Sequence, residues 1–178
     1  WYEGVEKQVS QLGFLLGRGA RERRRSLPLH QVVEEVTTPS SLYMREHGIT
    51  LINEIPSYTR TPSIYEAELH ALLLQIFSNS LKAVRNAPNR QICFRVVDKP
   101  DALGILILDT GVGLAPELRE KVFKPFETNS TPDPILGIGT GLGLWIVSEI
   151  VKSYSGKAQF VDVTEPWETG IEITLPLE

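Results

Sequence analysis

The chain has 178 residues and carries 18 Lys and Arg against 22 Asp and Glu, which gives a net charge of −4. This length allows one good-sized domain with its own core, and the mildly acidic balance gives no overall attraction for nucleic acid or an anionic membrane. The single cysteine, Cys93, excludes an internal disulfide and is typical of a reducing compartment, so we expect a cytoplasmic location. No apolar run has the length of a membrane span or of a signal segment.

The first predicted element is an amphipathic helix over residues 4–25. It ends in the basic run RERRR, which we interpret as a solvated helix end rather than a patch for nucleic acid or membrane, because the rest of the chain is acidic. Because the sequence opens at Trp1, inside this helix, we expect a longer parent protein, which can be membrane-anchored. A second helix is predicted over residues 29–47, interrupted near Pro39, and the segment ITLINEI after Gly48 alternates as a strand.

The helix predicted over residues 65–86 carries a polar stripe beside its apolar face. The stripe consists of Gln75, Ser78, Asn79, Lys82 and Asn86. A solvated face is usually richer in Glu and Lys, so this stripe suits a binding site as well as it suits water. The Asn79 oxygen could ligate Mg²⁺, a hard ion that prefers oxygen, and the Lys82 ammonium could meet phosphate oxygens, with a merely solvated Lys82 as the alternative.

Two adjacent strands are predicted next, over residues 90–98 and 103–109, joined by a turn at residues 99–101. The second strand runs into Asp109 and then a turn that contains Gly111 and Gly113. A carboxylate beside backbone that can be approached closely is suited to accept a hydrogen bond from an exocyclic amine such as that of adenine. The alternative is an ordinary turn residue at a strand end. Cys93 alternates with apolar neighbours on the first strand and is interpreted as structural.

A short helix is predicted from residue 116 to about 122, followed by the segment VFKPFET. We interpret its two aromatic residues, Phe123 and Phe126, as core residues that anchor a mobile segment. Two final strands, KAQFVDV and GIEITLPL, close the chain.

The segment GIGTGLGLWIVSEIV, residues 137–151, places four glycines directly before an apolar run at helical spacing. Glycine costs roughly 1 kcal/mol relative to alanine inside a helix, so the cluster needs a reason. Backbone N–H groups freed of side chains can close around an anion at a helix N-terminus, and a phosphate is the obvious candidate. The alternative is a flexible loop that enters a core helix.

With these residues in this order, the chain resembles the GHKL ATPase superfamily, and within it the catalytic, ATP-binding domain of sensor histidine kinases. Asn79 matches the N box of that family, and DTGVG at residues 109–113 matches its first glycine box. FKPF at residues 123–126 matches the F box, and GIGTGLGL at residues 137–144 matches the second glycine box. Each motif alone is weak, but the four in this order and at the usual spacing are specific, and the likeness covers residues 26–178.

The resemblance implies an α+β Bergerat fold, a two-layer sandwich in which about five strands form a mixed sheet covered on one face by three helices, with an N-terminal helix before it. It implies that residues 1–25 end a dimerisation or linker helix and that residues 26–178 form the ATP-binding catalytic domain. It also implies ATP and Mg²⁺ as cofactors, with Asn79 as metal ligand. The nucleotide-binding residues that it implies are Asn79, Lys82, Asp109, Gly111, Gly113, Thr128, Gly137, Gly139, Thr140, Gly141, Leu142 and Gly143.

The chain departs from the family pattern at two places in the site. Gln75 occupies the position where hydrolysing members of the superfamily carry a glutamate general base, and an amide cannot take a proton from water. The sequence therefore favours phosphoryl transfer to another group over ATP hydrolysis. The lid over residues 127–140 has no Lys or Arg, which leaves charge neutralisation to Mg²⁺, Lys82 and the helix N-terminus.

The phosphate acceptor is the third departure. None of the histidines, His30, His47 and His70, precedes an acidic residue as the family acceptor does, so we expect the acceptor outside this chain and assign no catalytic residue within it. The resulting hypothesis is the catalytic part of a two-component sensor histidine kinase, with its own dimerisation domain and a response regulator as partners and a homodimeric parent. The alternatives are a GHKL serine protein kinase and a nucleotide-binding module without catalysis, in which ATP controls assembly.

Overall fold

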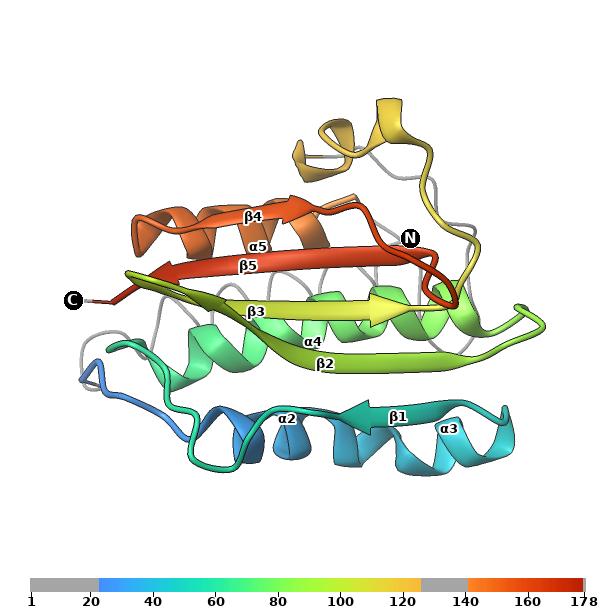
Figure 1. Cartoon of the computed structure of the whole chain (residues 1–178), viewed down its shortest axis with the longest axis horizontal. Helices are drawn as coiled ribbons and strands as arrows, with labels where there is room; N and C mark the ends of the chain where they lie inside the picture. Colours follow the sequence, from blue (N-terminus) through green and yellow to red (C-terminus); the bar gives the residue numbers. More distant parts are fainter. Residues whose placement is uncertain (1–22, 126–140, 178) are drawn as a thin grey trace, which may run out of the picture.

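The computed structural model describes residues 23–125 and 141–177. Its helices are α2 (Leu29–Thr37), α3 (Ser41–Glu46), α4 (Glu66–Val84) and α5 (Gly143–Ser153), with 3₁₀ turns at Thr38–Ser40, Pro116–Leu118 and Lys121–Phe123. Its strands are β1 (Thr50–Asn53), β2 (Gln91–Lys99), β3 (Ala102–Asp109), β4 (Lys157–Phe160) and β5 (Thr169–Pro176). The strands form one layer, and α2, α4 and α5 cover one face of it (Figure 1). This is the predicted two-layer α+β arrangement.

The sheet has five strands in the order β1-β2-β3-β5-β4. β1 runs parallel to β2, and the other neighbouring pairs are antiparallel, so the sheet is mixed, as predicted. The register pairs Asp109 with Ile92 on one side and with Thr169 on the other. The end of β3 is therefore held between the first residues of two other strands.

The core lies between the sheet and α4. The fully buried residues of α4 recur every three to four positions, as an amphipathic helix requires, and include Leu69, Leu73 and Ile76. On β3 the core residues are Leu103, Ile105 and Ile107, all at odd positions. Because strand side chains alternate between faces, Asp109 follows these residues onto the face that the helices cover.

Two local predictions were wrong. The chain at residues 23–25 is not helical. The amide of Arg25 donates to the carbonyl of Ile64 at 3.1 Å, and the carbonyl of Arg25 accepts from the amide of Ile64 at 3.1 Å, which makes Arg25 part of an antiparallel β-bridge. The rest of the predicted N-terminal helix lies outside the described residues, and the domain division at residue 25 stays a prediction. The helix predicted from residue 116 is instead a pair of 3₁₀ turns, because this short segment has no continuous apolar face to stabilise an α-helix.

The break near Pro39 is confirmed. α2 ends at Thr37, and a 3₁₀ turn leads into α3. Cys93 is fully buried on β2, and burial raises the pKa of its thiol to about 11, so its predicted structural role is supported. Among the described helices, none combines the length and the apolar character that crossing a bilayer would need.

Candidate functional site

Asp109 is a buried carboxylate at the end of β3. Only 4% of the residue is exposed, and its two oxygens have different donors. Ser80 Oγ on α4 donates to Oδ2 at 2.9 Å, and the amide of Gly111 donates to Oδ1 at 3.0 Å. Burial raises the pKa of this carboxyl to about 6, against the opposing effect of hydrogen bonds from Gly111, Ser80 and Thr169. The group is thus ionised at neutral pH although it lies inside the protein.

Gly111 lets the turn after β3 reach the backbone of α4. A Cβ built on Gly111 would lie 2.6 Å from the Cβ of Ala83 and 2.9 Å from its carbonyl oxygen. A side chain cannot be fitted at these distances, so any other residue would push the turn away from α4. Gly113, two residues on, has a φ of +72°, a left-handed conformation that glycine adopts without strain.

The polar stripe of α4 lies in a half-buried zone. Gln75, Asn79 and Lys82 are all of intermediate exposure, whereas Asn86 is exposed. Burial lowers the pKa of the Lys82 ammonium, so this cation has lost part of its hydration. A half-buried cation beside amide side chains is better suited to an anion than to open water.

The N-terminus of α5 lies against the same helix. A Cβ built on Gly143, the first residue of α5, would lie 2.8 Å from Gln75 Oε1. Gly141 has a φ of +71°, and Leu142 is the residue that precedes the first turn. One stretch of α4, from Gln75 to Ala83, therefore contacts both glycine motifs, the first through Ser80 and Ala83 and the second through Gln75.

The structure brings together most of the predicted site residues that it describes. Four of the predicted residues lie outside the described residues, namely Thr128, Gly137, Gly139 and Thr140. Phe126 also lies outside them. Phe123 is only partly buried, and its ring packs on Phe160 with centroids 5.5 Å apart, so it lies against the core rather than inside it.

Ser80 is the residue that sequence reasoning missed. It follows Asn79 directly and was not part of the polar stripe, because helical spacing places it on the buried side of α4. Its neighbours on that side of the helix, Phe77 and Leu81, are buried core residues. A hydroxyl at a buried helical position needs a hydrogen-bond partner, so the buried position of Ser80 on the helix was the feature that could have identified it.

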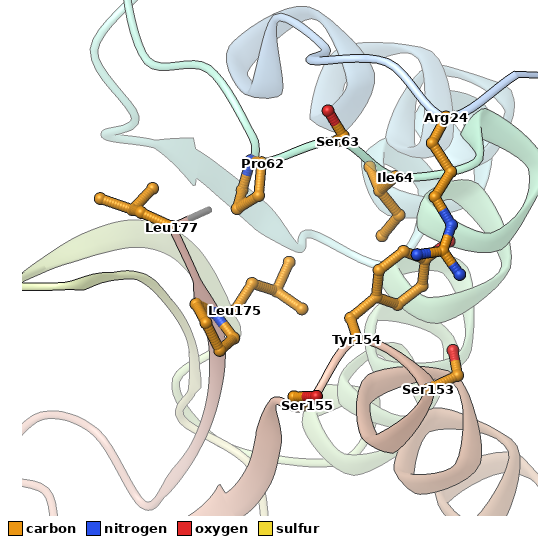
Figure 2. Close-up of a pocket in the computed structure, with 10 residues that line it drawn as sticks. Arg24, Pro62, Ser63, Ile64, Ser153, Tyr154, Ser155, Leu175 and Leu177 are labelled. Carbon is orange, nitrogen blue, oxygen red and sulfur yellow. The ribbon is translucent and has the colours of Figure 1, made fainter.

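A cavity of about 260 Å³ lies elsewhere, at the C-terminal ends of α5 and β5 (Figure 2). α5 has 11 residues, so this cavity is about 16 Å away from the N-terminus of the helix. The guanidinium of Arg24 lies 4.6 Å from the ring centroid of Tyr154 and 5.3 Å from that of Tyr65. The Tyr154 hydroxyl donates to Glu68, and burial raises the pKa of this hydroxyl. Among the predicted nucleotide-binding residues that the structure describes, none lines this cavity.

The three histidines have structural contacts. The Nδ1 atoms of His30, His47 and His70 lie 2.6, 2.9 and 2.8 Å from the backbone carbonyl oxygens of Ile55, Tyr43 and Glu66, respectively. His47 also stacks on the ring of Tyr43 at 4.1 Å. The prediction that none of them is the phosphate acceptor stays a prediction.

Comparison with known proteins gives the family. Residues 65–178 match the family described as histidine kinase-, DNA gyrase B-, and HSP90-like ATPase. The chain is 26% identical to the histidine protein kinase SaeS of Staphylococcus aureus over 190 aligned residues, which cover 99% of this chain and 52% of that protein. It is 27% identical to the sensory histidine kinase/phosphatase NtrB of Proteus hauseri over 173 residues, which cover 92% of this chain and 47% of that protein. The chain thus spans about half the length of these relatives.

Solved structures agree in fold. The catalytic domain of the histidine kinase ThkA superposes with a TM-score of 0.73 at 23% identity, covering 87% of this chain and 95% of that one. The Acinetobacter baumannii histidine kinase AdeS superposes with a TM-score of 0.72 at 17% identity, covering 99% of this chain and 78% of that one. These likenesses confirm the predicted Bergerat fold. The motifs, the sheet topology and the family match agree, and the chain belongs to the histidine kinase-, DNA gyrase B- and HSP90-like ATPases.

Proposed function

We propose that this chain binds Mg·ATP and is the catalytic part of a sensor histidine kinase, which transfers the γ-phosphate to a histidine on a dimerisation domain outside this sequence. The observation that carries the proposal is the position of α4 between the two glycine motifs. Ser80 and Ala83 hold the first motif and Gln75 meets the second, so a nucleotide that bridges the two motifs would lie along the stripe with Asn79 and Lys82.

The adenine would bind at Asp109. The two carboxylate oxygens have four lone pairs, and the hydrogen bonds from Ser80, Gly111 and Thr169 use three of them. An acceptor site therefore remains for the exocyclic amine of adenine. Gly111 and Gly113 leave the backbone open to close approach, since neither carries a side chain.

The triphosphate would lie between α4 and the start of α5. The first N–H groups of α5 have no partner within the helix, and they direct a partial positive charge at the space beside Gln75. Lys82 would add a full positive charge there, and contact with the phosphates would compensate for the hydration that its ammonium has lost. Thr128, Gly137, Gly139 and Thr140 would complete the phosphate contacts.

Mg²⁺ fits the donors that the stripe offers. The side chain of Asn79 provides one oxygen ligand, and Mg²⁺ in nucleotide sites keeps several waters and takes the remaining ligands from phosphates. When bound, the ion would neutralise charge on the phosphate oxygens. Asn79 would orient the nucleotide through that ion, while Lys82 would contact the phosphates directly.

The transfer step would work by positioning and charge neutralisation. The attacking group would be the neutral imidazole of the acceptor histidine, whose unprotonated nitrogen forms the new P–N bond as the bond between the γ-phosphorus and the bridging oxygen breaks and ADP leaves. The proton on the other ring nitrogen would then be lost to solvent. An imidazole nucleophile needs no carboxylate base, which agrees with an amide at Gln75. The dimerisation domain, a response regulator and a homodimeric parent are parts of this proposal, as is a cytoplasmic location, where ATP is available.

A second candidate is a nucleotide-binding module without catalysis. The observation in its favour is that Gln75 lies against Gly143 at the position of the general base, where it can position phosphates but cannot activate water. In that case ATP would control assembly rather than supply a phosphate.

Phosphate transfer from γ-labelled ATP separates the candidates. The parent protein should become labelled, and the label should be lost in acid and kept in base, as phosphohistidine requires. The Asp109→Asn parent serves as the matched control and should stay unlabelled at low ATP. An acid-stable, base-labile product would identify a serine kinase, and ATP binding without any label would identify the non-catalytic module.

A further inference from the structure

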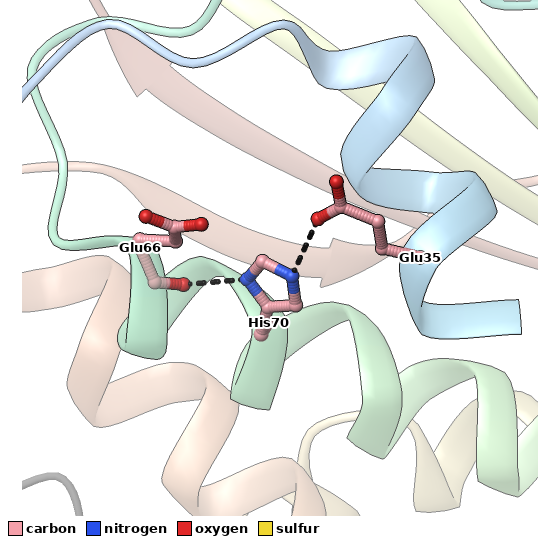
Figure 3. Close-up of side chains that lie close together, drawn as sticks. All are labelled: Glu35, Glu66 and His70. Carbon is pink, nitrogen blue, oxygen red and sulfur yellow. Dashed lines mark hydrogen bonds and ion pairs between the residues drawn. The ribbon is translucent and has the colours of Figure 1, made fainter. Parts of the chain in front are cut away.

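Three side chains from two helices converge on the side of the molecule where α2 meets the start of α4 (Figure 3). Glu35 comes from α2, and Glu66 and His70 come from the first two turns of α4. One ligand atom from each lies within 4.8 Å of the others. We propose that this cluster is a Zn²⁺ site that ties α2 to α4, independent of the nucleotide site.

The tautomer of His70 supplies the first argument. Its Nδ1 lies 2.8 Å from the backbone carbonyl oxygen of Glu66, and because a carbonyl only accepts, Nδ1 carries the hydrogen. In the neutral ring the lone pair of Nε2 then points at Glu35 Oε2, 3.1 Å away. Two lone pairs at this distance repel each other unless a proton or a metal ion lies between them, and the zinc titration below distinguishes an imidazolium–carboxylate pair from a metal site. Histidines that bind metals characteristically donate their other N–H to a backbone carbonyl or a carboxylate, as His70 does.

The distances supply the second argument. Zinc binds histidine nitrogen and carboxylate oxygen at about 2.0–2.2 Å, so two ligand atoms 3.1 Å apart subtend an angle of roughly 90–100° at the ion, somewhat below the tetrahedral angle. Glu66 precedes His70 by four residues and lies on the same face of α4, so its carboxylate can complete a set of three protein ligands. The fourth position would hold water.

The surroundings of the cluster fit a cation. Gln31 Nε2 donates to Glu35 Oε1 at 2.7 Å, which orients the carboxylate and leaves Oε2 for the ion. Arg25 forms an ion pair with Glu66, so this guanidinium competes with the ion for that one carboxylate. Because an imidazole ligand favours Zn²⁺ over Mg²⁺, this site would not compete for the magnesium of the nucleotide.

His30 provides a matched control within the same chain. Its Nδ1 also contacts a backbone carbonyl, that of Ile55, and its Nε2 lies 3.4 Å from Glu34, four residues along α2. It thus has the same tautomer and the same kind of carboxylate neighbour as His70. In the part of the chain that the structure describes, however, the only group of three suitable ligands is the one around His70.

The test is a titration of the chain with zinc chloride by calorimetry, in Mg²⁺ buffer without nucleotide. We expect one zinc ion per chain and a higher melting temperature with zinc present. His70→Ala and Glu35→Gln should each weaken zinc binding at least tenfold and abolish the thermal shift. His30→Ala should bind zinc as the unmodified chain does, and Arg25→Gln should bind it more tightly, because the guanidinium no longer competes for Glu66.

Three results would overturn the proposal: no saturable zinc binding, binding that His70→Ala retains, or equal losses in His30→Ala and His70→Ala. The second would place the ion elsewhere, and the third would show nonspecific binding by exposed histidines. Glu35→Gln keeps the shape of the side chain, so its loss of zinc binding cannot be ascribed to misfolding. ATP binding is measured in the same samples, and it should be unchanged in every variant.

Discussion

Ser80 Oγ donates a hydrogen bond of 2.9 Å to Asp109 Oδ2, and this bond joins the middle of α4 to the end of β3. The two residues are 3% and 4% exposed, so water cannot replace the bond. An ionised carboxylate inside a protein is costly unless donors surround it. The serine hydroxyl therefore makes it possible to keep a charged acceptor beneath the proposed adenine position.

Replacing Ser80 with Ala should destabilise the protein more at pH 8 than at pH 5. The variant removes one donor from a buried carboxylate, which costs on the order of 1–3 kcal/mol of unfolding free energy when the group is ionised. At pH 5 the carboxyl, with a pKa of about 6, is mostly protonated and depends less on that donor. Urea denaturation at both pH values measures the difference. Ser153→Ala, which removes an exposed hydroxyl bonded to the Ile150 carbonyl, is the control and should have little effect at either pH.

The raised pKa of Asp109 predicts a cost in stability at neutral pH. In the unfolded chain this carboxyl titrates near 3.9, and in the folded protein at about 6, so the folded state binds the proton more tightly. The stabilisation from protonated Asp109 is fully present below about pH 4, is lost as the pH rises to about 6, and amounts to at most roughly 3 kcal/mol. Asp109→Asn lacks this titration. Its free energy of unfolding should therefore increase relative to that of the unmodified chain as the pH rises from about 4 to about 6. A constant difference from pH 4 to pH 8 would contradict the prediction.

The same substitution should impair nucleotide binding. Asp109→Asn keeps the shape but places a donor where the adenine amine needs an acceptor, so ATP affinity should fall at least about tenfold by calorimetry, with the fold intact. In the unmodified chain, adenosine should bind more weakly as the pH falls through about 6, because Asp109 becomes protonated. Adenosine is the proper ligand here because it has no phosphates to titrate. Unchanged affinity in Asp109→Asn would remove this residue from the site.

The contrast between Asp109 and Ser80 shows what could be predicted from the sequence. Asp109 stands at the end of a strongly apolar strand and before two glycines, and these local features mark it as a site residue. Ser80 acts through a partner 29 positions away, and no local pattern contains that pairing. The sequence therefore predicted a role for Asp109 as a hydrogen-bond acceptor, but it did not predict Ser80 as the donor that stabilises this buried carboxylate.

The same distinction between local and long-range features decides which parts of the fold could be predicted. The long helix α4 and the strands β2, β3 and β5 have hydrophobic periods sustained over eight or more residues, and these elements were predicted to within a few residues. Residues 23–25 were expected to be helical from their neighbours, but the extended pairing of Arg25 with Ile64 depends on a segment far along the chain. Backbone hydrogen bonds made over long range are decided by the tertiary structure, which local propensity does not contain.

Asn79→Ala should weaken ATP binding far more in Mg²⁺ than in EDTA. If the Asn79 oxygen acts through the ion, its removal affects only the metal complex of the nucleotide. Calorimetric titrations with ATP in both buffers measure the two losses. Asn86→Ala, an exposed amide at the end of the same stripe, is the matched control and should bind ATP normally in both. Equal losses of Asn79→Ala in Mg²⁺ and in EDTA would mean that Asn79 touches the nucleotide directly.

Hydrolysis tests the mechanism at Gln75. If this amide leaves water without a base, the isolated chain should bind ATP but hydrolyse it barely above background. Gln75→Glu keeps the shape of the side chain and places a carboxylate beside Gly143 at the N-terminus of α5, where the helix dipole favours the ionised form. A positioned general base typically contributes about 10²–10⁴-fold, and we expect part of this, roughly tenfold or more, in steady-state phosphate release.

Gln75→Ala separates base catalysis from a looser site. It opens the same space without supplying a carboxylate, so phosphate release should stay at the level of the unmodified chain. A pH profile of Gln75→Glu adds a second criterion, because the rate should fall at low pH as the new carboxylate becomes protonated, whereas a gain caused by loosening has no reason to follow that titration. Rapid hydrolysis by the unmodified chain would contradict the kinase proposal and indicate an ATPase whose base lies at another residue.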